Sequence, residues 1–367
     1  MKIIKTDLPL LTCTYPISSV LPLEKTIFLD IETTGFSAKN SNLYLIGCIY
    51  CKESRYHLIQ WFASSYEEEP VILQAFFTFI KGYTHLVHFN GNQFDIPYLV
   101  QKAAQYKLSH SLDTFTALDL YKRIAPYRSV LKLPDCKQKT IEIFLNVDRN
   151  DLCLGGELIS VYQHYVCFPQ EDALQILLLH NADDVQGLVA LLPILAYCDL
   201  FNEELRVTKV QANHYTDING NVKQELLMHL QLPTPLPVTI SFGVSNCYFT
   251  GLGNTGSLRI PVFEEEMKYF YANYRDYYYL PEEDTAMHKS VAKFVDREHR
   301  IQASASTCYT RKIASYLPQW DTLFEPFFKR EYNSKDLFFE LTDEFKKKRS
   351  AFSQYASHIL RMMVKYS

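Results

Sequence analysis

Two acidic residues, Asp30 and Glu32, lie at the end of an apolar stretch within the sequence FLDIETTGF at 28–36. Residues 26–31 predict a buried β-strand that is followed by a turn. Side chains two apart on a strand point to the same face, so the two carboxylates would lie about 6–7 Å apart along the chain. Two unscreened carboxylates this close repel each other, and a divalent cation removes the repulsion. The pair therefore indicates a metal site, with a turn carrying solvated acids as the alternative.

A third acid, Asp95, belongs to the sequence HFNGNQFDIPYL at 88–99. The pattern predicts a short buried strand at 85–89, a turn that contains Asn90, and a helix whose first turn carries Asp95. In an α/β sheet, ligands bind in the crevice formed by the strand ends and the turns that follow them. Asp95 is accordingly a candidate ligand. The alternative is an acid that only satisfies the positive end of the helix dipole.

The last candidates, His180 and Asp184, belong to the sequence LLHNADDVQGL at 178–188. Apolar residues recur with a helical period over 171–195, and residues i and i+4 share one helix face. A carboxylate and an imidazole on a largely buried helix are costly unless they are paired, hydrogen-bonded or bound to a metal. A core histidine with satisfied hydrogen bonds is the alternative for His180, and Asp183 would be solvated.

The elements that must position these residues follow from two different sequence patterns along the chain. After an extended lead-in at 1–24, residues 25–202 predict three antiparallel strands and then alternating strands and helices, which is the pattern of a mixed α/β sheet covered by helices. After residue 202, short alternating segments separated by Asn-Gly, Pro and Gly predict a small β module at 203–263. A helical, aromatic-rich region is expected at 264–367.

Composition narrows the class of protein. The 367 residues carry a formal net charge of −4, so no global basic field marks a nucleic-acid binder, although local positive grooves are sufficient for phosphate contacts. The nine cysteines follow no framework spacing, as is usual for reduced thiols in a cytosolic protein. Prolines interrupt the apolar runs at the N-terminus, and no run reaches the about 20 residues of a membrane span, so we expect a cytoplasmic protein without a membrane partner.

Two sets of cations could contact a phosphate backbone. One set follows the predicted strand at 111–120, which ends near Asp119, an acid that could support the site. The other set lies in the aromatic-rich C-terminal region, where cations and tyrosines together are suited to a single strand. For both sets, the alternative is a surface that contacts only solvent. The first set contains Arg123, Arg128, Lys132, Lys137 and Lys139, and the second contains Lys289, Lys293, Arg297, Arg300, Arg311 and Lys312.

In combination, the motifs resemble the DEDD-type 3′–5′ exonucleases of the ribonuclease H-like superfamily, and more closely the YprB-like branch of bacterial predicted exonucleases. The resemblance covers about residues 24–200. It rests on FLDIETTGF, on YLIG at 44–47, on FNGNQFDIPYL, on LPDCKQKTIEIFL followed by GGELISVY, and on HNADDVQGL. It implies a ribonuclease H-like fold with a mixed five-stranded sheet and two catalytic divalent ions, Mg²⁺ or Mn²⁺. Asp30, Glu32, Asp95 and Asp184 would take the four ligand positions.

The resemblance also implies the activity, which is hydrolysis of phosphodiester bonds in DNA or RNA from a single-stranded 3′ end, in nucleic-acid repair or turnover. A helicase or repair factor is the expected protein partner. One position departs from the family pattern. The tyrosine subtype carries Tyr-x3-Asp and the histidine subtype carries His-x4-Asp, whereas this chain has His180-x3-Asp184. We expect His180 to act as the general base, with a structural or substrate-contact role as the alternative. The competing function is a catalytically silent scaffold that binds nucleic acid or a partner.

Overall fold

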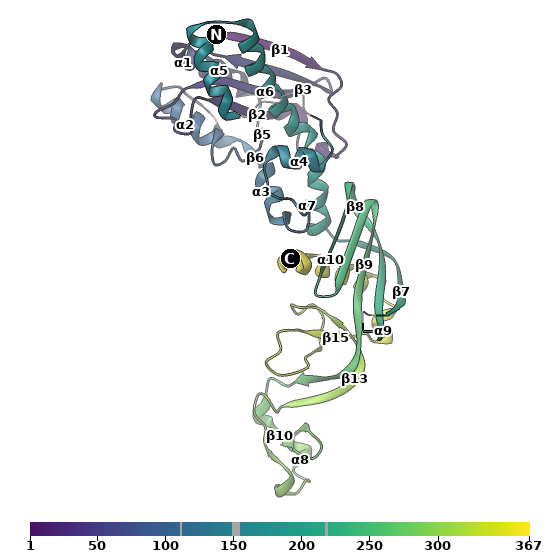
Figure 1. The fold of residues 1–367 in the computed structure, drawn as a ribbon. Helices are drawn as coiled ribbons and strands as arrows, with labels where there is room; N and C mark the ends of the chain where they lie inside the picture. The colour runs from purple at the N-terminus through teal and green to yellow at the C-terminus, as the bar shows by residue number, and fades with distance from the viewer. Residues whose placement is uncertain (111, 149–154, 217–218) are drawn as a thin grey trace. The chain divides into compact units, whose positions relative to one another are not determined.

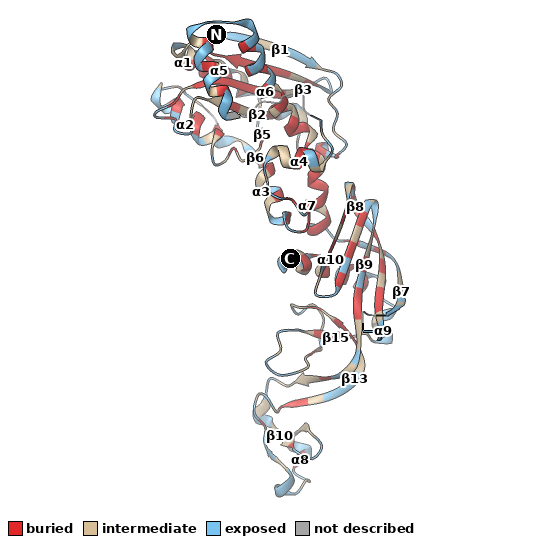
Figure 2. Cartoon of the chain, in the orientation of Figure 1, coloured by how far each residue is buried: buried red, intermediate tan, exposed pale blue. Residues whose placement is uncertain are grey.

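A computed structural model describes residues 1–110, 112–148, 155–216 and 219–367 (Figure 1). The chain separates into two compact units, Met1–Cys198 (unit 1) and Asp199–Ser367 (unit 2). Each unit has its own sheet and its own buried residues (Figure 2).

Unit 1 is built on a mixed sheet with the strand order β1-β4-β3-β2-β5-β6. Near its centre lies β2 (Thr26–Thr33), which pairs antiparallel with β3 (Leu43–Lys52) and parallel with β5 (His85–His88). The hairpin partner of β3 is β4 (Arg55–Phe62), and β6 (Thr116–Asp119) lies parallel to β5. The predicted mixed sheet and antiparallel hairpin are confirmed.

The sheet has six strands, so the expected five is wrong by one. The extra strand is β1 (Lys2–Leu8), which pairs antiparallel with β4 from Lys2 opposite Phe62 to Leu8 opposite Tyr56. The lead-in is therefore extended as predicted, but it is part of the sheet. Lysine, threonine and aspartate interrupt the apolar residues of β1, KIIKTDL, and most of its side chains are exposed, as is common for an edge strand. Because of this composition, a search for buried apolar runs does not find the strand.

Helices cover both faces of the sheet. On one face, α1 (Glu69–Phe79) and α2 (Asp95–Gln105) contribute to a core with the central strands. On the other, α5 (Gly155–Cys167) and α6 (Glu171–Ala190) pack through residues such as Tyr162 and Leu177. The remaining helices of this region are short, namely α3 (Leu120–Ile124), α4 (Gln138–Phe144) and α7 (Leu195–Asn202).

The stretch Glu171–Asn202 is long and apolar enough to cross a membrane, with a mean hydropathy of 1.5. However, 72% of its most apolar window is buried inside the protein. Its apolar character is thus accounted for by packing, because a helix that lies in a protein core is hydrophobic on most sides.

Unit 2 is mainly antiparallel β-structure. Its larger sheet has the order β14-β15-β13-β9-β8-β7 and a second sheet has the order β11-β10-β12. The strands of the larger sheet are β7 (Arg206–Thr216), β8 (Val222–Val244), β9 (Cys247–Phe270), β13 (Tyr309–Pro318), β14 (Phe327–Phe328) and β15 (Phe338–Glu340). The smaller sheet contains β10 (Tyr277–Leu280), β11 (Thr285–His288) and β12 (Ile301–Gln302).

The expected division of unit 2 at residue 263 needs correction. Strand β9 runs through this position to Phe270, and strands continue as far as Glu340. Helices are present in the C-terminal region, but α8 (Lys289–Ala292) and α9 (Asp343–Lys346) are short, and only α10 (Arg349–Lys365) is long. The physical reason is the abundance of tyrosine and phenylalanine, which pack well on a pleated sheet and favour strands over helices.

A buried ion pair fixes α2 relative to α1. The Lys102 amino group lies 2.8 Å from the Glu69 carboxylate and donates to the Ser41 carbonyl at 2.6 Å, and both charged side chains are almost fully buried. The Glu69 carboxylate also accepts from the Leu43 amide at 2.7 Å and from the Tyr106 hydroxyl at 2.6 Å. Because Lys102 and Asp95 belong to the same helix, seven residues apart, this network also sets the position of Asp95.

Replacement of Lys102 by Met should lower the free energy of unfolding by about 3–5 kcal/mol, because it leaves the buried Glu69 carboxylate without its cation. Urea titration of the purified protein measures this loss. The matched control, Lys81→Met, removes an exposed lysine and should change stability by less than about 0.5 kcal/mol. Equal stabilities of the two variants would contradict the structural role of the pair.

Candidate metal centre

The Asp30 carboxylate is held in place by a hydrogen-bonded chain that begins on β4, which is separated from β2 by β3. The Gln60 amide on β4 donates to Asn181 Oδ1 and to the Leu178 carbonyl, both at 2.9 Å. Asn181 on α6 in turn donates from Nδ2 to Asp30 Oδ2 at 2.9 Å. Because an amide that accepts at its oxygen must present its NH₂ group elsewhere, this chain orients Asn181 as a donor to Asp30.

Two glycines allow α6 to approach its neighbours closely. Gly47 on β3 pairs with Asp30, and a Cβ at this position would overlap the Asn181 side chain. Gly187 on α6 faces α4, where a Cβ would overlap the Glu142 carboxylate. The α4 side of this contact also includes Gln138, whose amide donates to the Asp184 carbonyl at 2.9 Å. The backbone of α6 is therefore located from both sides.

Helix α6 presents His180 and Asp184 toward Glu32. His180 Nε2 lies 3.2 Å from Asp184 Oδ2 and 3.7 Å from Glu32 Oε1. One potential ligand atom from each of these three residues lies within 4.8 Å of the others. The i, i+4 spacing places His180 and Asp184 on one face, as predicted, and the end of β2 brings Glu32 to the same point. The expectation that Asp183 is solvated is wrong, because this residue is buried at 7% exposure.

Asp95 opens helix α2 and is 7% exposed. Its carboxylate accepts hydrogen bonds from its own amide and from the Ile31 amide, which joins it to β2. Burial raises the pKa of Asp95 to about 7, and the negative charges of Asp119 and Asp184 add to this rise. The backbone hydrogen bonds act in the opposite direction, because they stabilise the ionised form.

The four acids predicted from the sequence, Asp30, Glu32, Asp95 and Asp184, interact electrostatically at one place and together form what we call the acidic cluster. Burial raises the pKa of Asp30 well above its ordinary value, and repulsion from the other three carboxylates raises it further. The hydrogen bond from Asn181 lowers this pKa but does not offset the rise. The structure thus brings all four acids and His180 together.

The turn before Asp95 is supported by a polar pair at the ends of β5 and β6. The Gly91 amide donates to His88 Nδ1 at 3.0 Å, and the Asn90 amide donates to Asp119 Oδ1 at 2.9 Å. A Cβ at Gly91 would lie 2.8 Å from the His88 ring and 3.1 Å from the Asp95 carboxylate. Burial lowers the pKa of His88, in agreement with a neutral ring that accepts at Nδ1. His88 and Asp119 therefore support the site without joining the acidic cluster.

A groove of about 700 Å³ adjoins the segments that hold the acidic cluster in place, and none of the four acids lines it. Two of its lining residues connect it to the site: Asn90 in the turn before Asp95, and Gln138, which bonds to the Asp184 backbone. Phe89 and Tyr121 also line it with ring centroids 6.1 Å apart, as do the cations Arg128 and Lys137 and the acid Asp135. Part of the first basic set predicted from the sequence thus lies beside the site.

A second aromatic feature lies near the acids on β2 and α2. Phe36, six residues after Asp30, is 94% exposed, and its ring lies 6.1 Å from that of Phe94, the residue before Asp95. A phenylalanine this exposed loses the stabilisation that burial of its ring would give. It is therefore available to contact a ligand.

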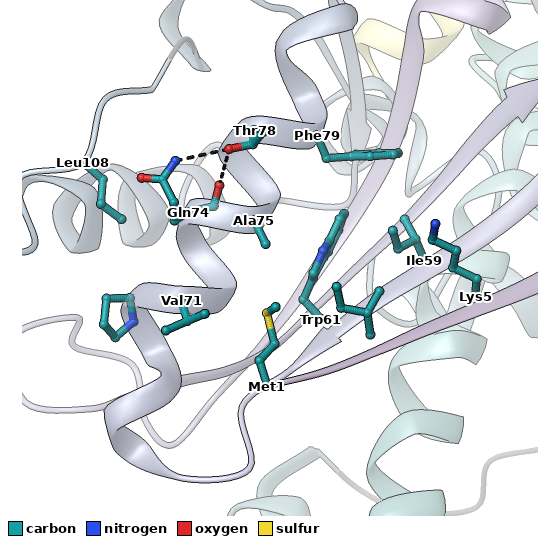
Figure 3. A pocket seen from close by; sticks show the side chains of 12 residues that line it. Met1, Lys5, Ile59, Trp61, Val71, Gln74, Ala75, Thr78, Phe79 and Leu108 are labelled. Atoms are coloured by element: carbon teal, nitrogen blue, oxygen red, sulfur yellow. Dashed lines mark hydrogen bonds between the residues drawn. The ribbon is translucent and has the colours of Figure 1, made fainter.

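A further groove of about 650 Å³ lies between β1, β4 and α1 (Figure 3). Its lining is mostly apolar and includes Met1, Trp61, Val71 and Phe79, and no member of the acidic cluster lines it. This groove is therefore separate from the candidate metal centre.

Sequence reasoning missed the residues that position the acids, above all Asn181, Gln60 and Gly47. Asn181 lies between His180 and Asp184 in the motif HNADD, which is a local signal that a polar residue other than an acid is required there. Gly47 ends the motif YLIG at 44–47, but neither Gly47 nor Gln60 carries a local signal of its role, because that role depends on how closely α6 lies against the sheet.

Residues 27–196 match the family model of the RNase_H superfamily. With its mixed sheet and flanking helices, this part of the chain has a ribonuclease H-like fold, as the sequence motifs predict. A search of curated proteins gave no match.

Three solved structures give weak similarity. The family B DNA polymerase of Pyrobaculum calidifontis has a TM-score of 0.40 at 15% identity, over 48% of this chain and 25% of its own. Exonuclease I of E. coli with a dT13 oligonucleotide has a TM-score of 0.31 at 10% identity, over 56% of this chain and 54% of its own. A product-bound exonuclease I has a TM-score of 0.32 at 10% identity, over 93% of this chain and 72% of its own. The chain thus spans a quarter of the polymerase and about half of the E. coli exonuclease, and scores this low carry no argument about its site.

The raised pKa of Asp95 predicts that metal-free protein loses stability as the pH rises. Folding moves this pKa from 3.8 to about 7, so between these values the unfolded state releases its proton while the folded state keeps it. Asp95→Asn removes this penalty. In EDTA at pH 8 the variant should be more stable than the parent by about 2–4 kcal/mol, and the difference should nearly vanish at pH 4.5.

Urea unfolding at the two pH values measures this difference. The exposed acid Asp113 supplies the control, because Asp113→Asn should show no such pH dependence. A stability difference for Asp95→Asn that is the same at pH 4.5 and pH 8 would exclude the raised pKa as its cause.

Proposed function

We propose that the protein is a divalent-metal-dependent nuclease that hydrolyses phosphodiester bonds, acting as a 3′–5′ exonuclease on single-stranded DNA or RNA. The observation that carries this proposal is the convergence of four carboxylates from β2, α2 and α6, with Asp30 half-buried among them. The family match over residues 27–196 supports it. The YprB-like branch and the polarity of cleavage are part of the proposal and rest on the ordered sequence motifs.

The donor set of the acidic cluster fits hard divalent cations. Carboxylate oxygens suit Mg²⁺ or Mn²⁺, whereas zinc sites favour nitrogen and sulfur. The raised pKa of Asp30 also supports a cation at this position, because buried like charges need a compensating positive charge. Asp30, Glu32, Asp95 and Asp184 would hold the ions. Two bound divalent ions supply positive charge that stabilises the attacking and leaving oxygens of phosphoryl transfer.

His180 is the best candidate for a group that accepts a proton. Its Nε2 atom faces the carboxylates of Glu32 and Asp184, and its ring is 4% exposed. Imidazole is suited to proton transfer at neutral pH, where a positioned base contributes about 10²–10⁴-fold to rate. The chain carries His180 four residues before Asp184, and the helix keeps it beside the acids at this spacing.

Aromatic rings near the acids, of which Phe36 is exposed and the others are half-buried, favour a single strand as the substrate. Bases stack on aromatic rings and phosphates pair with cations, whereas a duplex keeps the base faces inside its own stack. Phe36 and Phe94 lie on one part of the site, and Phe89 and Tyr121 line the adjoining groove with Arg128. The strand would reach the acids along these surfaces.

Nuclease activity can be tested with Mn²⁺ and single-stranded oligonucleotides labelled at either end. The parent should release mononucleotides from the 3′ end and leave a ladder of 5′-labelled products. Asp30→Asn should lower the rate at least about 10²–10³-fold, because it removes a charge from the centre of the acidic cluster.

The matched control is Asp172→Asn, which neutralises an exposed acid on the same helix as Asp184 and should leave the rate unchanged. Intact label in the parent across DNA and RNA would overturn the enzyme proposal. It would favour a silent nucleic-acid-binding scaffold.

His180→Gln tests the proton acceptor. At saturating Mn²⁺ we expect kcat to fall about 10²–10⁴-fold with KM nearly unchanged. A role limited to positioning the carboxylates would instead raise the Mn²⁺ concentration needed for half activation and leave kcat at saturating Mn²⁺ near the parent value.

A further inference from the structure

Unit 2 contains a pocket of about 310 Å³ that is lined mainly by aromatic side chains. We call it the aromatic pocket. Its aromatic members come from β9, the segment that follows β9, β14 and the loop after β14, and one lysine completes the polar part of the wall. These six residues are Phe270, Tyr271, Tyr274, Phe327, Lys329 and Tyr332.

Strand alternation explains why one ring of β14 reaches the pocket. Phe328 is 5% exposed and packs in the core against Tyr316, with ring centroids 5.0 Å apart. Its neighbour Phe327 points to the opposite face, as successive strand residues do, and lines the pocket. Elsewhere in the wall, the rings of Phe270 and Tyr332 meet with their centroids 5.3 Å apart.

Two rings of the wall keep their faces available. Over the described part of the chain, neither Tyr274 nor Phe327 makes a ring contact, although most aromatics around them are paired. Tyr332 is 41% exposed. An aromatic face that borders a hollow and lacks an aromatic partner is suited to stack a planar ring of a ligand.

Lys329 gives the aromatic pocket its charge. Its backbone is fixed by paired hydrogen bonds with Lys268, at 2.8 and 2.9 Å, while its amino group makes one long bond of 3.4 Å to the Tyr332 carbonyl. Among the residues that the structure describes, no carboxylate lies within ion-pair distance of this amino group, since the adjacent Glu331 is engaged by Lys268 at 2.8 Å. No acid lines the pocket.

We propose that the aromatic pocket binds one nucleotide of a single strand, with its base against Tyr274 and Phe327 and its phosphate at Lys329. A cationic ligand, which such aromatic walls can also hold, is disfavoured by the lysine. The volume is at the small end of the about 300–1,000 Å³ of ligand sites, in agreement with a single nucleotide unit. The choice of nucleic acid rests on the proposed nuclease function, but the pocket is a second site in a different unit.

Binding to the metal-free full chain in EDTA tests the proposal, with fluorescence anisotropy of labelled 12-nucleotide oligo-dT and oligo-U as the two arms. Tyr274→Ala and Phe327→Ala should each raise Kd about 5- to 100-fold, because each removes a stacking surface. Tyr274→Phe should keep the parent affinity, since the ring is retained. Lys329→Gln should weaken binding and reduce the slope of log K against log salt concentration by about 0.7, the value for one lost phosphate contact.

Phe294→Ala and Lys209→Gln are the matched controls, because they remove an exposed ring and an exposed lysine of unit 2 outside the pocket and should leave Kd unchanged. If Tyr274→Ala and Lys329→Gln both bind the oligonucleotides with the Kd of the parent, the proposal is overturned. Free dTMP that binds as tightly as the 12-mer would overturn the assignment to a strand.

Hydrolysis of bis(p-nitrophenyl) phosphate with Mn²⁺ separates this proposal from the nuclease proposal. This substrate is too small to span two sites, so Tyr274→Ala should hydrolyse it at the parent rate. A parent that hydrolyses nothing would contradict the nuclease function, and the anisotropy series would still decide the aromatic pocket. Unchanged hydrolysis together with unchanged Kd would overturn the aromatic pocket alone.

Discussion

Repulsion among buried carboxylates is the constraint on which the rest of unit 1 depends. Water would screen these charges and separate them, but burial holds Asp30 beside three other acids and raises its pKa. A fold can keep such a cluster only if other interactions offset the repulsion. The donors aimed at the acids, Asn181 at Asp30 and the Ile31 amide at Asp95, are part of that compensation. A bound divalent cation would supply the remainder.

The scaffold meets this constraint by fixing three elements independently. Strand β2 is central in the sheet and paired on both sides, so the backbone that carries its two carboxylates cannot move away from the other acids. Helix α2 is anchored by the Lys102–Glu69 pair, two turns from Asp95. Helix α6 is located by its contacts with β3 and α4. The acids therefore stay close because backbone elements hold them, and their side chains need not adapt when a cation binds.

The sequence was sufficient to predict the acids because their spacing is local. Two residues on a strand and four residues on a helix fix relative directions before any tertiary contact forms, and the structure agrees for Asp30, Glu32, His180 and Asp184. The supporting residues could not be found this way, because the role of Gly47 depends on a helix more than a hundred residues away. The strands after residue 263 were missed for a related reason, since aromatic strands and amphipathic helices share much of their composition.

The close approach of α6 has a consequence for how the chain can vary. Gly47 carries no functional group, yet a single methyl group there would overlap Asn181 and Val185 on the helix that bears both His180 and Asp184. A survey of all substitutions would therefore record Gly47 as an intolerant position, as it would the acids themselves. A glycine that does not vary at such a position would reflect the close approach of a helix to a strand. It would not indicate that the residue takes part in the chemistry.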